Sequence, residues 1–82
     1  MEKIFVKDGR EYWVYFDRRE VFITTLGDRF VSEQICKDIM TQLNWKPLKT
    51  FMVFYIKGYR CIALGYKAPF FKNPVSEIEK IF

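Results

Sequence analysis

The side chains that most often carry catalytic chemistry are scarce in this chain. It has no histidine, so an imidazole base, an ordinary Ser-His-Asp triad and the usual zinc sites are not expected. Cys36 and Cys61 have no CxxC partner, and we interpret them as small buried apolar residues, with a disulfide or redox role as the alternative. Glu77 and Glu79 are two residues apart on an expected helix, so their carboxylates point in different directions. No phosphate-binding glycine loop, nucleophile elbow or calcium loop occurs. We therefore expect no enzymatic activity, no cofactor and no metal.

Positive charge is concentrated in the second half of the chain. The net charge is +4; residues 1–41 carry seven basic and eight acidic side chains, and residues 42–82 carry seven basic and two acidic ones. A basic segment interleaved with aromatic residues is typical of nucleic-acid binding, because cations contact phosphates and rings stack on bases. The alternative is a solvated lysine surface that keeps an aromatic-rich domain in solution. The candidate nucleic-acid contacts are Lys49, Lys57, Arg60, Lys67 and Lys72, with Tyr59 and Tyr66 as stacking rings if exposed.

A smaller basic cluster occurs in the first half of the chain. Its members are Arg10, Arg18, Arg19 and Arg29, and neighbouring carboxylates are Asp8, Glu11, Asp17, Glu20 and Asp28. Because acidic and basic side chains alternate so closely here, we expect local ion pairs rather than a ligand site.

Hydrophobic periodicity and turn residues predict five strands and two helices. Asp8-Gly9 and Lys57-Gly58 favour tight hairpin turns, because these residues tolerate positive φ angles. A helix is expected from an N-cap at Ser32 to about Asn44, and a short second helix from Asn73-Pro74. The expected strands are Glu2–Val6, Glu11–Phe16, Val21–Leu26, Thr50–Ile56 and Tyr59–Tyr66. The predicted fold is a single α+β domain, residues 1–82, with a five-stranded, mainly antiparallel sheet and two helices in the order βββα-ββα.

Apolar residues occur on both faces of the expected sheet. In the first hairpin, alternation places Phe5 and Tyr12 on one face and Trp13 and Tyr15 on the other. Two helices on one face cannot cover both, so either the sheet curls over itself or an aromatic face stays open. An open face around Trp13 and Tyr15 would be a surface for a protein partner or a second copy of the chain.

The two halves of the chain are similar to each other. Tyr12–Phe16 parallels Phe51–Tyr55, and Ile23–Gly27 parallels Ile62–Gly65 with one residue dropped. One interpretation is a duplicated ββα unit with pseudo-twofold symmetry; the other is a chance likeness between two aromatic hairpins.

The stretch from Tyr12 to Leu43 resembles the three-strand-plus-helix DNA-binding domain of plant ethylene-response factors and the arm-type domain of phage integrases. The resemblance is carried by Tyr12–Phe16, by Ile23–Gly27, by Phe30 and by the helix from Ser32. It implies a sheet that lies in the DNA major groove, with the helix packed behind it. Those domains present a basic sheet, whereas this half is slightly acidic, so we expect DNA contact from the second hairpin instead.

These observations together favour a non-enzymatic binding module that contacts nucleic acid through the second hairpin. The alternative is a protein–protein module that uses Trp13 and Tyr15, such as a homodimer subunit or an inhibitor similar to small phage or mobile-element proteins. The expected partner is nucleic acid or an acidic protein surface. The first residues lack the apolar stretch of a signal peptide, and no apolar run has membrane-spanning length, so we expect a cytoplasmic protein without a membrane partner.

Overall fold

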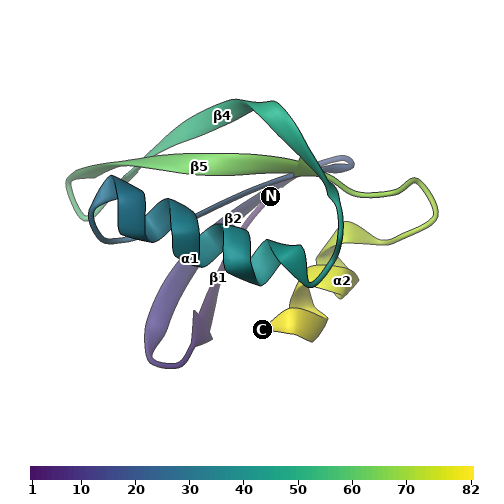
Figure 1. Ribbon diagram of the computed structural model, residues 1–82, viewed down its shortest axis with the longest axis horizontal. Coiled ribbons are helices and arrows are strands. Elements are labelled where there is room, and N and C mark those ends of the chain that lie inside the picture. The colour runs from purple at the N-terminus through teal and green to yellow at the C-terminus, as the bar shows by residue number, and fades with distance from the viewer.

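A computed structural model describes all 82 residues as one antiparallel sheet with two helices (Figure 1). The five strands lie in the order β1-β2-β3-β5-β4. The predicted α+β class and the order βββα-ββα are confirmed. Neither helix is long and apolar enough to cross a membrane. The elements are β1 (Glu2–Lys7), β2 (Arg10–Asp17), β3 (Glu20–Thr25), α1 (Arg29–Thr41), β4 (Lys46–Ile56), β5 (Tyr59–Lys67) and α2 (Pro74–Ile81).

Two hairpin turns have the backbone conformation that their sequences predict. Asp8 and Gly9 have φ angles of 52° and 77°, and Lys57 and Gly58 have φ angles of 53° and 82°. Positive φ at both central residues is the type I′ geometry, whose twist matches that of the flanking strands. The first turn sets the register of β1 against β2, in which Phe5 lies opposite Tyr12, as expected.

Pairing between β3 and β5 joins the two halves of the sheet. Val21 lies opposite Tyr66 and Ile23 opposite Leu64. The hairpins β2–β3 and β4–β5 are thus arranged about this pair as a pseudo-twofold axis would place them. The helices depart from that symmetry, because α1 packs on β3 and β5 while the end of α2 packs on β1 and β2 through Phe82. A duplication therefore stays a prediction.

The larger core lies between the sheet and both helices. It joins Val14 and Ile23 of the sheet to Met40 of α1 and Ile78 of α2, all fully buried or nearly so. The stacked rings of Phe5 and Phe82, with centroids 4.9 Å apart, close this core at the β1 side. Both helices therefore cover the same face of the sheet, as expected.

Of the two predicted N-cap residues, one is confirmed and the other is wrong. Asn73 caps α2 as predicted, with its side-chain oxygen accepting the Ser76 backbone N–H at 3.1 Å. The predicted cap of α1 at Ser32 is wrong: Asp28 caps the helix by accepting the Val31 N–H at 3.1 Å. Asp28 follows Gly27, whose φ of 144° lets the chain turn from β3 into the helix one turn earlier. Ser32 is buried inside α1, and its hydroxyl donates to the Arg29 carbonyl.

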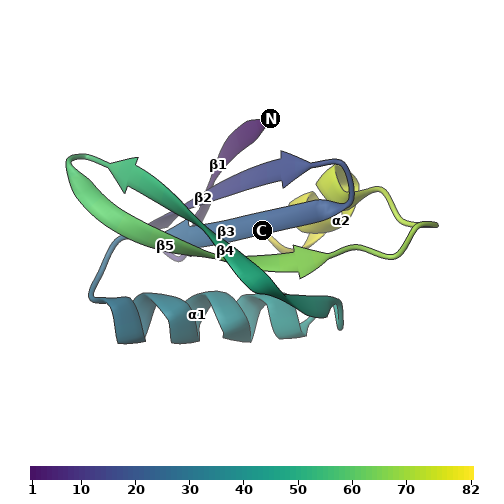
Figure 2. The same cartoon turned by 90° about the horizontal axis from the view of Figure 1, so that it is seen from above.

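The opposite face of the sheet is partly closed by curvature of the sheet itself. β4 starts at Lys46 rather than at the expected Thr50, because Lys46 and Pro47 pair with the end of β5. A register shift between Pro47 and Phe51 then interrupts the pairing of β4 with β5. Such irregularities bend a strand and increase its twist. Figure 2 shows the tip of the β4–β5 hairpin bending away from α1. Near this tip, Ile56 and Cys61 pack with Trp13 of β2 in a second, smaller core.

This curvature corrects the expectation of an open aromatic face at Trp13 and Tyr15. The Trp13 side chain is 9% exposed, so it is part of a core rather than a partner surface. Tyr15 is half-buried, and its ring meets the Phe54 ring edge-on at a centroid distance of 6.4 Å. Of the two arrangements considered from sequence, the sheet that curls over itself is the one observed around Trp13.

Both cysteines are buried free thiols, in agreement with their interpretation as small apolar residues. Desolvation raises the pKa of the Cys36 thiol to about 12 and also raises the pKa of Cys61. Both thiols therefore stay protonated at neutral pH, which makes them poor nucleophiles.

The contact between β3 and β5 leads to a stability prediction at Gly65. A Cβ at this position would lie 2.7 Å from the Phe22 ring and 3.0 Å from the Thr50 carbonyl oxygen. Gly65→Ala should therefore lower the free energy of unfolding by about 1–3 kcal/mol, measured by chemical denaturation. In a Phe22→Leu background the same change should cost less, because the smaller side chain relieves the crowding. Equal costs in both backgrounds would contradict the close packing described.

Candidate nucleic-acid interface

The β4–β5 hairpin carries exposed aromatic rings among exposed cations. Tyr55 and Tyr59 are 74% and 67% exposed, and Phe51 is also exposed. Tyr55 lies directly opposite Arg60 in the strand register, so the ring and the guanidinium project from the same face of the hairpin. Phe51 shares this face by alternation, whereas Tyr59 lies opposite Ile56 and projects from the other face. We define the hairpin surface as the six exposed residues on both faces of this hairpin, Lys49, Phe51, Tyr55, Lys57, Tyr59 and Arg60.

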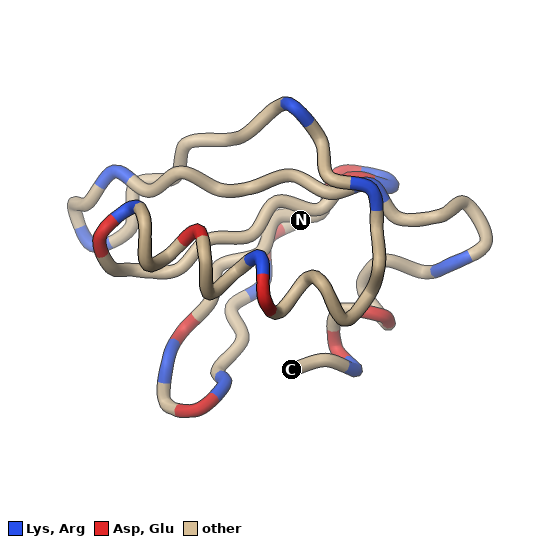
Figure 3. Tube along the Cα trace, in the orientation of Figure 1, with Lys and Arg blue, Asp and Glu red and all other residues tan.

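The charge of the hairpin surface is poorly compensated. No acidic residue occurs anywhere in β4, β5 or the turn between them, and Figure 3 shows the cations along this hairpin. Lys57 is the one hairpin cation with an acidic partner, and its Nζ is 3.5 Å from the Glu11 carboxylate of β2. Lys49 and Arg60 form no ion pair. An anion that approaches the hairpin therefore meets a positive potential with little to neutralise it.

The irregular part of β4 determines where Lys49 lies. Three residues, Leu48 to Thr50, occupy the interval in which β5 has only Gly65. The extra residues make β4 bow outward from the sheet, as Figure 1 shows at its upper edge. Lys49 is exposed on this bow, at the free edge of the sheet.

The structure does not bring all the predicted contact residues together. Lys67 lies at the far end of β5 from Tyr59 and Arg60, opposite Glu20 of β3 and Lys46 of β4. Lys72 lies beyond β5 in the segment that leads to α2, with its Nζ 3.9 Å from Glu77. The predicted set therefore divides between the hairpin surface and the opposite end of the sheet.

Tyr66 was expected to stack on a base only if its ring were exposed, and the ring is buried. It is 8% exposed, and its ring belongs to the core beneath the helices. The cause is strand alternation, since Tyr66 lies opposite Val21, which is also buried on that face. Burial raises the pKa of its hydroxyl above the ordinary value.

The arginines of the first half do not form the expected local ion pairs, with one partial exception. Arg29 pairs with Glu33 at 2.9 Å, although Glu33 was not among the expected partners. Arg10 donates to the Leu26 carbonyl, and Arg19 donates to the carbonyls of Pro69 and Lys72. Arg18 is exposed and forms neither a hydrogen bond nor an ion pair through its side chain. The nearby carboxylates are therefore not used to neutralise this cluster.

A second cationic and aromatic region, missed from the sequence, lies between the β2–β3 turn and the segment before α2. A cavity of about 520 Å³ is lined there by Arg18, Arg19, Lys72 and two adjacent phenylalanines, together with Asn73 and Pro74. We call this feature the loop cavity. The sequence signal that could have indicated it is Phe70-Phe71-Lys72, an apolar pair beside a cation in a segment with no helix or strand pattern.

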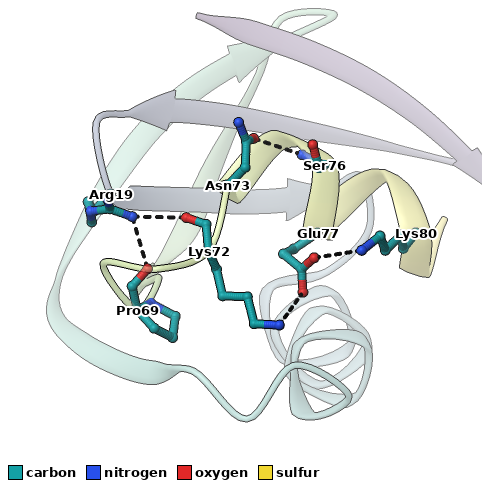
Figure 4. A network of polar contacts seen from close by, with 7 residues as sticks. All are labelled: Arg19, Pro69, Lys72, Asn73, Ser76, Glu77 and Lys80. Carbon is teal, nitrogen blue, oxygen red and sulfur yellow. Dashed lines mark hydrogen bonds and ion pairs between the residues drawn. The ribbon is translucent and has the colours of Figure 1, made fainter.

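Arg19 fixes the wall of the loop cavity. Its Nη1 donates to the Pro69 and Lys72 carbonyl oxygens, both at 2.9 Å (Figure 4). The backbone continues this attachment, because the Ala68 N–H donates to the Arg19 carbonyl at 2.8 Å. The segment from Ala68 to Lys72 is therefore tied to the β2–β3 turn at both of its ends.

Comparison of the chain with protein-family models, with curated proteins and with solved structures gives no match. These comparisons therefore assign no role to either surface.

Arg19→Gln tests the anchoring of the loop cavity. Without the two charged hydrogen bonds, the segment from Ala68 to Lys72 should open more readily, so the amide hydrogens of Ala68 and Lys72 should exchange about tenfold faster. Hydrogen exchange followed by NMR measures this effect, and the amides of Val14 and Ile23 in the core serve as internal references. Unchanged exchange at Ala68 and Lys72 would show that Arg19 does not hold the segment.

Proposed function

We propose that this domain binds nucleic acid through the hairpin surface. The observation that supports the proposal is the exposure of three aromatic rings beside cations on a hairpin that has no acidic residue. Lysine and arginine contact phosphates without regard to sequence, and aromatic rings stack on any base. On this proposal the domain holds its ligand without carrying out chemistry on it.

The arrangement favours single-stranded nucleic acid over a duplex. Phe51, Tyr55 and Tyr59 can stack only on bases whose flat faces are accessible, and these faces are covered in a duplex. Tyr55 and Arg60 are cross-strand neighbours, so a base on the ring places the attached phosphate within reach of the guanidinium. Lys49 extends the same track of positive charge along the free edge of the sheet.

A protein partner is the second candidate, and the structure gives it less support. Trp13, on which that hypothesis was based, is buried, and Tyr15 is half-buried. The exposed apolar residues left on β1 are Ile4 and Val6, and neither is aromatic. An acidic protein surface would meet the same hairpin cations, so the experiment below includes an acidic polypeptide.

Binding of a fluorescent single-stranded oligonucleotide, measured by anisotropy over a salt series, tests the proposal. For three phosphate contacts, the logarithm of the association constant should fall with the logarithm of salt concentration with a slope of about −2. Lys57→Gln with Arg60→Gln should reduce the magnitude of this slope by about 1.4. Tyr55→Ala should weaken binding by about 1–3 kcal/mol with little change of slope, because it removes stacking rather than charge.

Lys37→Gln is the matched control, since Lys37 is exposed on α1 and forms no ion pair. Equal losses for this variant and the hairpin double variant would mean that net charge, rather than the hairpin, drives binding. Absence of oligonucleotide binding, or tighter binding of polyglutamate than of the oligonucleotide, would overturn the proposal.

A further inference from the structure

The loop cavity is a second cationic and aromatic region, separate from the hairpin surface. It lies beside the β2–β3 turn and the exit of β5, whereas the hairpin surface extends from the bow of β4 to the β4–β5 turn. It is an open depression of about 520 Å³ rather than an enclosed pocket, so a ligand in it would keep one side in solvent. It is already shaped in this structure, because Arg19 holds one wall against the β2–β3 turn.

The charge of the cavity lining selects for an anion. Three of the seven lining residues are cations, and none is acidic. Arg18 has no acidic partner, and the guanidinium of Arg19 meets only neutral carbonyl groups. Lys72 shares Glu77 with Lys80, whose Nζ lies closer to that carboxylate, at 2.9 Å against 3.9 Å (Figure 4). Glu77 therefore offsets only part of the charge on Lys72, and a phosphate could accept hydrogen bonds from Arg18 and Lys72.

The aromatic part of the lining selects for a flat ring. Phe70 and Phe71 are 79% and 69% exposed, although phenylalanine is normally among the most buried residues. Their rings meet edge to face, with centroids 5.5 Å apart at an interplanar angle of 88°. The Lys72 ammonium also lies over one face of the Phe71 ring, 5.9 Å from its centroid. A planar heterocycle can stack on the ring faces that these two contacts leave free.

We propose that the loop cavity binds a nucleoside phosphate, with the phosphate on Arg18 and Lys72 and the base against Phe70 or Phe71. Neither feature alone specifies this ligand: the cations accept any anion, and the rings accept any flat apolar group. A phosphate joined to an aromatic base through one sugar satisfies both within a single cavity. A free nucleotide and the phosphorylated end of a nucleic-acid strand have this chemistry in common.

Titration of the ¹⁵N-labelled protein with AMP, adenosine and inorganic phosphate tests the proposal by NMR. AMP should give saturable shifts at residues 18–19 and 68–74, and it should bind about tenfold more tightly than adenosine or phosphate alone. Arg18→Gln and Phe70→Ala should each weaken AMP binding by about tenfold, while Lys37→Gln should leave it unchanged. Phe70 and Arg18 are exposed, so these variants should fold, and their amide spectra report on that directly.

Further titrations separate the sources of the ligand and the competing class of partner. A 5′-phosphorylated oligonucleotide that shifts the cavity residues more strongly than its unphosphorylated form does would identify the strand end as the source. AMP binding without that difference would identify a free nucleotide. The Lys57→Gln, Arg60→Gln variant should weaken oligonucleotide binding at the hairpin but leave AMP binding unchanged, so this test does not depend on the proposed function. No saturable shift with AMP, equal AMP affinity in Arg18→Gln, or shifts produced only by phosphatidylserine vesicles would overturn the inference.

Discussion

Antiparallel pairing between β3 and β5 is the interaction on which the rest of the structure depends. It is the only strand pairing that connects the first three strands to the last two. It brings Val21 and Ile23 beside Tyr66 and Leu64, and α1 packs over both strands. The same pairing directs the chain leaving β5 past the β2–β3 turn, where Arg19 holds it. The loop cavity is therefore a direct consequence of how the two halves meet.

The curvature of the second hairpin decides which aromatic residues are available. Because β4 bulges opposite Gly65 and its tip bends toward β2, Ile56 and Cys61 cover Trp13. Burying these side chains together gains the favourable free energy of removing apolar surface from water. Tyr55 and Arg60, which alternate with Ile56 and Cys61 along the strands, project from the other face of the hairpin and are exposed. One bend thus closes the surface expected around Trp13 and leaves exposed the surface that we propose binds nucleic acid.

Turns and helix caps were predictable from the sequence, whereas burial and contacts between distant segments were less so. The Asp8-Gly9 turn and the Asn73 cap were predictable because turns and caps depend on a few adjacent residues. The burial of Trp13 was left open, because strand alternation assigns a face but does not say whether the sheet bends over it. Arg19 was expected to pair with nearby carboxylates, and its actual partners are some fifty residues away in the chain. Lys57 and Lys72 share one basic stretch of sequence, but only the fold shows that they lie on different surfaces.

The central claim, that nucleic acid contacts the β4–β5 hairpin, is tested most directly by mapping a single-stranded oligonucleotide onto the ¹⁵N-labelled protein. At moderate salt, the largest amide shifts and the strongest intermolecular contacts should occur between Lys49 and Arg60, with the Tyr55 and Tyr59 ring protons moving upfield as bases stack on them. Shifts confined to α1 or β1, or tyrosine ring signals that do not move at saturation, would contradict the account.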